Sequence, residues 1–101
     1  MLQAQIYIDR SDMHGSQSVY EFIMHFLLLN RVDGATAFKG MMGFGRNQIM
    51  HRPNELFSFD TPPVVIIFID EDVKVLEVLQ NLRAEYKGGF IITHKVDLFK
   101  A

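Results

Sequence analysis

The sequence predicts a single α+β domain whose elements follow one another in the order β-α-β-β-α-β. Two stretches with helical periodicity alternate with strand-like stretches, and one direct β–β connection lies between the two predicted helices. The chain of 101 residues fits one domain, residues 1–101, with no room for a second core. This order of elements is that of the ferredoxin-like arrangement, an antiparallel four-stranded sheet with both helices on one face.

The first strand and the first helix have the clearest patterns. Residues 3–9 alternate between apolar and polar side chains, which predicts a half-buried strand. Apolar residues then recur at helical spacing and predict a helix that runs to about Asn30. Ser18 and Glu21 have the spacing of a capping box, so Ser18 is the expected N-cap, with Ser16 as the alternative.

The middle of the chain combines two strands with a long connection. Residues 35–44 have the character of a strand, although their glycines indicate a bulge or a close backbone approach. Residues 46–61 show no strong period, and a loop of that length in a small domain is usually functional or disordered. Residues 64–69 are apolar throughout, which predicts a central strand covered on both faces.

The second helix and the last strand complete the predicted fold. Asp70 is the expected N-cap of this helix, and the Lys87-Gly88-Gly89 sequence is expected to end it. The inward stripe of the helix is predicted to contain Val75, Leu79, Leu82 and Tyr86, with Leu76 beside them. Residues 90–99 alternate as a strand would, and His94 has the parity that we assign to the core face.

Composition excludes several classes of protein and site. The chain has no cysteine, which excludes disulfides and thiolate nucleophiles and is compatible with a reducing cytoplasm. Its net charge is −2 and no two Lys or Arg residues are adjacent, so nothing resembles the basic surface of a nucleic-acid-binding protein. The N-terminus lacks the pattern of a signal peptide, and the longest apolar run, residues 64–69, is too short to span a membrane. We therefore expect a cytoplasmic protein that does not itself span a membrane.

The hydrophobic content predicts self-association. Hydrophobic residues make up 49% of this small chain, and the third strand is apolar on both faces although the helices are expected to cover only one. A second copy of the chain is the simplest cover for the other face. The alternative is a monomer with a well-filled core.

Several short segments together resemble a known family. They are, in chain order, Ser11-Asp12, His14-Gly15, Tyr20-Glu21, Gly34-Ala35-Thr36, Gly40-Met41-Met42-Gly43-Phe44-Gly45 and Asp60-x-Pro62-x-Val64-Val65. Their order and spacing resemble the PII-like proteins catalogued as domain of unknown function one-ninety, over residues 6–100. The family usually has a proline where this chain has Ser16-Gln17-Ser18, so the geometry of the first loop is not carried over.

The resemblance implies both an assembly and a function. It implies a homotrimer of ferredoxin-like subunits whose sheets face inward. In the wider PII superfamily, small ligands, often adenine nucleotides, bind in clefts between subunits, and a long loop transmits the signal to a target. Members of this family occur beside or joined to fluoride-channel proteins, so a membrane transporter or channel is the implied partner. The resemblance thus predicts a signal-transduction protein.

The resemblance also assigns ligand-binding residues. Gly43, Gly45, Arg46 and Asn47 are similar to the Gly-Phe-Gly-Arg-Gln sequence at the loop base of PII proteins. Glycines expose backbone N–H groups that bind anions, and an arginine beside them supplies a forked set of donors. The alternative is a β-bulge with a solvated Arg46.

A second glycine segment can likewise be interpreted as a ligand-binding loop or as a purely structural feature. Lys87, Gly88 and Gly89 occupy the position of a phosphate-contacting loop in PII proteins. The alternative for them is a helix C-cap, with the lysine complementing the helix dipole. The residues expected to contact a partner lie in the long loop and are His51, Arg52 and Glu55.

Two other classes of function remain open, and an enzyme is not indicated. A structural interaction module would use the same loop and leave the clefts empty. A metal-responsive protein similar to the CutA copper-tolerance fold would use Met41 and His51, although no two histidines have the spacing of metal ligands. The chain lacks a nucleophile elbow, a P-loop and paired carboxylates flanked by apolar residues, so we expect no enzyme.

Overall fold

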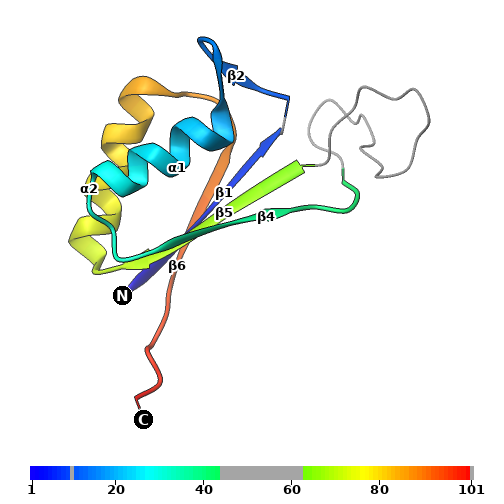
Figure 1. The fold of residues 1–101 in the computed structure, drawn as a ribbon. Helices are drawn as coiled ribbons and strands as arrows, with labels where there is room; N and C mark the ends of the chain where they lie inside the picture. The colour runs from blue at the N-terminus through cyan, green and yellow to red at the C-terminus, as the bar shows by residue number, and fades with distance from the viewer. Residues whose placement is uncertain (10, 44–62, 101) are drawn as a thin grey trace.

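The computed structural model describes residues 1–9, 11–43 and 63–100 (Figure 1). Its elements are β1 Leu2–Asp9, β2 Met13–His14, β3 Gln17–Ser18, α1 Val19–Leu29, β4 Ala35–Lys39, β5 Pro63–Asp70, α2 Asp72–Glu85 and β6 Phe90–Lys95. A four-stranded antiparallel sheet has the strand order β4-β5-β1-β6. Both helices lie against the same face of this sheet (Figure 1). The predicted ferredoxin-like α+β fold is therefore confirmed.

β1 occupies the interior of the sheet because it pairs with β5 on one side and with β6 on the other. Its predicted alternation is confirmed, since Ala4, Ile6 and Ile8 are buried under the helices. Tyr7 lies on the opposite face and is 38% exposed. A single apolar core thus fills the space between the helices and one face of the sheet.

Each helix buries one stripe of side chains against the sheet. The buried residues of α1 recur every four positions, at Val19, Ile23 and Leu27. The buried residues of α2 are Val75, Val78, Leu79 and Leu82. Leu76, expected beside this stripe, is 49% exposed, and Tyr86 lies just beyond the helix as its C-cap residue.

The helix starts differ from the predicted capping. Ser18 is the N-cap of α1, but its side chain makes no capping hydrogen bond, so the predicted capping box is absent. Asp70 is not the N-cap of α2. It is the last residue of β5, because its pairing with Leu2 extends the strand, and Glu71 is the N-cap. The Asp70 carboxylate instead accepts a hydrogen bond from the Glu71 N–H at 2.8 Å.

The loop before α1 contains a hairpin that the sequence analysis missed. β2 and β3 pair Met13 with Ser18 and His14 with Gln17. Gly15 lies in the turn with a φ of 64°, a conformation that favours glycine. Two-residue strands contain too few positions for an alternating pattern, which is why the segment resembles a polar loop in sequence.

The last strand has the opposite parity to the predicted one. Ile91 lies opposite Ile6 of β1 and packs against the core, so the odd-numbered residues of β6 face the helices. His94 lies opposite Gln3 on the other face and is exposed, so its assignment to the core is wrong. The apolar run over residues 90–92 permits either parity in sequence, and the pairing with β1 selects one of them.

The helices cover only one face of β5. Its even-numbered residues from Val64 to Phe68 are buried under the helices, whereas Val65, Ile67 and Ile69 are half-buried on the other side. We call the helix-free side of the sheet the open face. Its residues, assigned from the strand register, are Gln3, Gln5, Tyr7, Asp9, Thr36, Phe38, Pro63, Val65, Ile67, Ile69, Phe90, Ile92 and His94. Within one chain, β5 is therefore covered on one face only, and not on both faces as its sequence predicted.

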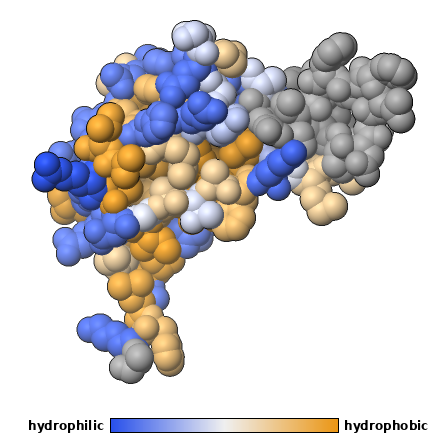
Figure 2. All heavy atoms as spheres, viewed as in Figure 1, coloured by the Kyte–Doolittle hydropathy of each residue, from blue (hydrophilic) through white to orange (hydrophobic). Residues whose placement is uncertain are grey.

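The C-terminal segment leaves the sheet after β6. β6 ends at Lys95 and β4 at Lys39, whereas the sequence predicted strands that reach residues 99 and 44. Figure 2 shows apolar residues that continue into this segment, where Leu98 and Phe99 are exposed. Within the described residues, neither helix is long and apolar enough to cross a membrane.

Candidate functional site

Three connections meet at one end of the sheet, which we call the loop end. The strand register places them there, because Asp9 lies opposite Pro63 and Tyr7 lies opposite Phe90. The described residues of the loop end are Asp9, Ser11, Asp12, Gly40–Gly43, Pro63 and Tyr86–Gly89. They include Gly43, Lys87, Gly88 and Gly89 of the predicted ligand-binding residues.

The remaining predicted residues lie outside the described part of the chain. They are Gly45, Arg46 and Asn47 of the ligand site and His51, Arg52 and Glu55 of the partner loop. Their assignments, and that of residues 46–61 as a long loop, stay predictions.

Within one chain the two predicted glycine segments do not meet. Gly43 follows β4 at one edge of the sheet, and Gly89 precedes β6 at the other edge. Three strand spacings of about 4.8 Å separate these edges, or about 14 Å. The two segments are therefore not parts of one site within a single chain.

The backbone closes tightly where β4 ends. The Gly40 N–H donates a hydrogen bond to the Pro63 carbonyl at 2.6 Å. A Cβ atom at Gly40 would lie 2.9 Å from Pro63 Cγ, and one at Gly43 would lie 3.2 Å from the same atom. A larger side chain at either position would crowd Pro63. This is the close approach that the glycines in this segment indicated in the sequence.

Arg83 organises the turn between α2 and β6, a role that the sequence analysis missed. Its Nη1 atom donates to the Tyr86 carbonyl at 3.4 Å and to the Gly88 carbonyl. Lys87 Nζ in turn donates to the Arg83 carbonyl at 2.9 Å. A lysine on a carbonyl of the last helical turn is the C-cap arrangement that we considered as the alternative for Lys87.

Gly88 and Gly89 both lie close to other atoms of the chain, and Gly89 also has a backbone conformation that favours glycine. Gly89 has a φ of 71°, and a Cβ atom there would lie 3.0 Å from the Tyr7 carbonyl oxygen. A Cβ atom at Gly88 would lie 2.6 Å from the Tyr86 hydroxyl oxygen. The turn is therefore held in shape by contacts with its own chain, before any ligand binds.

A tyrosine links this turn to the segment after β1. The Tyr86 hydroxyl donates a hydrogen bond to Asp12 Oδ2 at 3.4 Å. Asp12 is held in place because its N–H donates to the Asp9 carbonyl at 3.0 Å and its carbonyl accepts from Val19 at the start of α1. Ser11 donates to Asp9 Oδ1 through both its N–H and its hydroxyl.

The pKa values of Tyr86 and Asp12 are both raised above their ordinary values. Burial raises the pKa of the Tyr86 hydroxyl to about 12, and the neighbouring Asp12 carboxylate adds to the rise. Burial, followed by the charge of Asp9, raises the pKa of Asp12, while the hydrogen bond from Tyr86 lowers it. At neutral pH the tyrosine is protonated and acts as the donor of the contact.

No enclosed nucleotide pocket is formed by the described residues of a single chain. A hollow of about 150 Å³ at the loop end is lined by Tyr20, Ala37, Phe38, Lys39 and Val64. It is smaller than the roughly 300–1,000 Å³ of typical ligand pockets. A wider hollow of about 420 Å³ lies beside Asp33 and Ile69, at the opposite end of β5, and is open to solvent.

The metal-responsive alternative, which uses Met41 and His51, stays untested because His51 lies outside the described residues. Within residues 1–9, 11–43 and 63–100, no group of three or more His, Asp or Glu residues is placed to hold a metal ion. Met41 and Met42 are 77% and 58% exposed, so they do not fill the core as methionines in a strand usually do. The reason is that β4 ends before them, at Lys39.

Sequence comparison places the chain among proteins described as uncharacterised. The family model DUF190, described as "Uncharacterized ACR, COG1993", matches residues 1–98. A "UPF0166 protein" of Aquifex aeolicus (strain VF5) is 24% identical over 85 residues, which cover 83% of this chain and 80% of that protein.

Comparison with solved structures identifies PII-like folds. CPII from Thiomonas intermedia K12, described as a nitrogen regulatory PII-like protein bound to ADP, AMP and bicarbonate, matches with a TM-score of 0.68. The match covers 99% of this chain and 93% of that chain at 16% sequence identity. A second CPII structure, bound to ADP and bicarbonate, matches with a TM-score of 0.63 at 18% identity and covers 92% of this chain and 82% of that chain. The overall fold is therefore PII-like.

Proposed function

We propose, because this chain belongs to the DUF190 family, that it is a PII-like signal-transduction protein and not an enzyme. In this proposal three copies assemble with their open faces inward and bind a small anionic ligand, of the adenine nucleotide class, in the clefts between them. The observation that carries it is the position of Gly43 and Gly89 at the same end of the sheet but at opposite edges.

The open face supports self-association. The described residues of its strands contribute aromatic and branched side chains, and Phe38 and Phe90 are 54% and 55% exposed in the single chain. Apolar area removed from water stabilises an assembly by roughly 25 cal/mol per Å². A second copy presents the same largely apolar surface and is therefore a suitable cover.

The ligand class is proposed from the relatives and from the loop end. CPII is described as bound to adenine nucleotides and bicarbonate, which supports the same class here. The backbone of Gly43 and of the turn at Gly88 would lie on the two sides of one cleft, with Arg46 as the main cation. Lys87 is held on the Arg83 carbonyl, so it would contribute only after leaving that contact.

The partner is proposed to bind residues 46–61, through His51, Arg52 and Glu55. A membrane transporter or channel on the cytoplasmic side of a membrane is the partner class that the family resemblance implies. Ligand binding at the base of this segment would change its order and thereby control docking.

One observation favours a second candidate, a structural interaction module with empty clefts. Gly89 has a reason within the chain, its φ of 71° and its approach to the Tyr7 carbonyl oxygen, that does not involve a ligand. The two candidates differ in whether any nucleotide stabilises the protein.

Light scattering combined with thermal unfolding tests the proposal. We expect a mass about three times the 11.7 kDa of one chain. A ligand at a hundredfold excess over its Kd adds about 2.7 kcal/mol, which raises Tm by several degrees in a domain of this size. ADP, AMP and ATP are each added with and without bicarbonate.

The matched variants are Arg46→Asn and Arg31→Asn. The first should abolish the nucleotide-induced rise in Tm and leave the trimer mass unchanged. The second removes the same charge at the far end of α1, where a φ of 61° is one that asparagine tolerates, and should keep the rise. A trimer that no nucleotide stabilises would favour the interaction module, and a monomer would contradict the assembly.

A further inference from the structure

The turn between α2 and β6 offers backbone N–H groups to solvent. Gly88 and Gly89 are exposed, and among the described residues no acceptor is found for the N–H of either glycine. Two carbonyls of the same turn are already occupied, because those of Tyr86 and Gly88 both accept from Arg83. Backbone donors without acceptors, beside carbonyls that are bound elsewhere, make a turn that favours an anion.

Arg83 fixes the path of this turn. Its Nη1 atom bonds the carbonyls of Tyr86 and Gly88, which flank Lys87 in the chain. The Tyr86 N–H donates to the Leu82 carbonyl at 2.8 Å, so the turn is also held where it leaves α2. A guanidinium presents its donors in a rigid plane, whereas a lysine ammonium is a point charge on a flexible stem. The two carbonyls are therefore kept on the Arg83 side of the turn.

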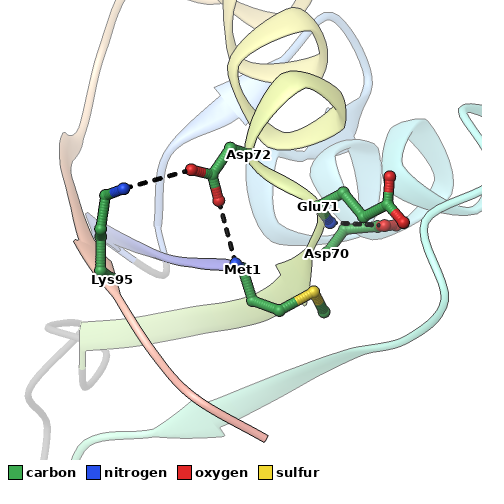
Figure 3. A network of polar contacts seen from close by, with 5 residues as sticks. All are labelled: Met1, Asp70, Glu71, Asp72 and Lys95. Carbon is green, nitrogen blue, oxygen red and sulfur yellow. Dashed lines mark hydrogen bonds and ion pairs between the residues drawn. The ribbon is translucent and has the colours of Figure 1, made fainter.

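The charge of Arg83 is not neutralised by a carboxylate in the described part of the chain. The ion pairs among those residues are made by Asp72, at the start of α2 (Figure 3). Asp12, which also reaches the turn, accepts from the Tyr86 hydroxyl instead. A positive charge beside the turn thus remains available to favour an anion near it.

We propose that Arg83 is a positioning residue for the anionic ligand: by holding the carbonyls of Tyr86 and Gly88, it keeps the N–H groups of Gly88 and Gly89 free for that ligand. This inference rests on the proposed function, in which the turn borders the ligand cleft, and it names how the turn is prepared for binding. The ligand bonds the backbone, and Arg83 acts through that backbone without touching the ligand.

The size of the effect follows from the population of the binding conformation. A ligand that binds only one conformation of the turn has an apparent Kd that rises as this conformation becomes rarer. Gly88 and Gly89 have wide backbone freedom, so the turn has other conformations to adopt once its carbonyls are released. A turn that keeps the binding conformation about a tenth of the time raises the Kd about tenfold.

Calorimetric titration of the assembled protein with ADP and with AMP tests the inference. Arg83→Gln removes the guanidinium and should raise the Kd about tenfold, with the mass from light scattering unchanged. Arg83→Lys keeps the charge without the planar set of donors, and should bind as weakly as Arg83→Gln. Full recovery of affinity in Arg83→Lys would mean that charge alone sustains binding, which overturns the positioning role.

A second readout needs no ligand. NMR relaxation of the amide nitrogens reports the order of the Gly88 and Gly89 N–H bonds, with order parameters of about 0.85 for a rigid backbone and below about 0.6 for a flexible one. We expect both glycines to be rigid in the unaltered chain and flexible in Arg83→Gln. Equal order parameters in the two proteins would overturn the inference.

A matched control separates this inference from a general effect of charge. Lys74→Gln removes a positive charge from the first turn of the same helix, about 14 Å from Arg83 along the axis, and should leave the Kd and the order parameters unchanged. An unaltered chain that binds neither nucleotide contradicts the proposed function and this inference together. An unaltered chain that binds, with an Arg83→Gln variant of equal affinity, leaves the proposed function intact and overturns the role of Arg83 alone.

Discussion

The carboxylate of Asp70 accepts a hydrogen bond from the backbone N–H of Asp33, 37 residues earlier in the chain, at 3.3 Å. The other oxygen of the same carboxylate accepts from the Glu71 N–H. Asp70 is only 8% exposed, and it is the one buried charged residue in the described part of the chain. It therefore joins the turn before β4 to the start of α2.

Asp70→Ala should lower the free energy of unfolding by about 1–3 kcal/mol, because it leaves two backbone donors without their acceptor. Urea denaturation measures this loss. Asp97→Ala removes the same charge from an exposed position and should change the stability by less than about 0.5 kcal/mol. Equal stabilities for the two variants would contradict a structural role for Asp70.

Gly89→Ala should be destabilising, because residue 89 has a φ of 71° and its Cβ would lie 3.0 Å from the Tyr7 carbonyl oxygen. The left-handed backbone alone costs an alanine about 1–2 kcal/mol. Gly34→Ala is the matched control, since its Cβ would meet nothing within 4 Å. That variant should be neutral or more stable by up to about 1 kcal/mol. Thermal unfolding of both variants distinguishes backbone strain at residue 89 from a general effect of losing a glycine.

Tyr86 should ionise at a higher pH than an exposed tyrosine, because burial and Asp12 raise its pKa to about 12. A titration of tyrosinate absorbance should therefore show one of the three tyrosines ionising last, and Tyr86→Phe should remove that step. The protonated form is the one favoured by folding. Its contribution to stability is thus present below the tyrosine pKa of the unfolded chain, about 10, and is lost as the pH rises toward 12. If Tyr20→Phe removed the late step instead, the assignment to Tyr86 would be wrong.

Asp72 should stabilise the fold only above acidic pH. The hydrogen bond from the Met1 amino group, followed by the charges of Met1 and Lys95, lowers the pKa of the Asp72 carboxyl (Figure 3). Its contribution is therefore present above about pH 3.9, the value of an unfolded aspartate, and is lost as the pH falls through the lowered pKa. Asp72→Asn should be less stable than the unaltered chain at pH 7 and equal to it at the acid limit. Added salt should narrow the difference at pH 7, because the pair is solvent-accessible, and a salt-independent difference would argue against an ionic cause.

The order of elements could be predicted because most of them carry an unambiguous period. Gln3, Gln5 and Tyr7 interrupt the apolar residues of β1 at every second position, so only one parity is allowed. β6 begins with three consecutive apolar residues, and either of its faces is a suitable core face in sequence. The pairing of Ile91 with Ile6, a long-range contact, decides between them.

Less of the candidate site could be predicted from the sequence. Its contacts depend on the backbone path of the turns, which no periodic pattern in the sequence reveals. Arg83 looks like an ordinary polar residue of α2, and its donation to the Gly88 carbonyl follows only from the path of the turn. The glycines at positions 88 and 89 were identified, but the sequence does not distinguish an anion-binding backbone from one that passes close to Tyr86 and Tyr7. Both need a residue without a Cβ.

The position of β1 inside the sheet also affects how the protein is made. Leu2 pairs with both Asp70 and Lys95, so β1 cannot complete its pairing until β5 and β6, which lie later in the sequence, have been synthesised. At about 5–20 residues per second, translation separates β1 from β6 by several seconds. During that interval the nascent chain exposes an apolar strand with unpaired backbone groups, which is the kind of segment that chaperones bind and that aggregates when they do not.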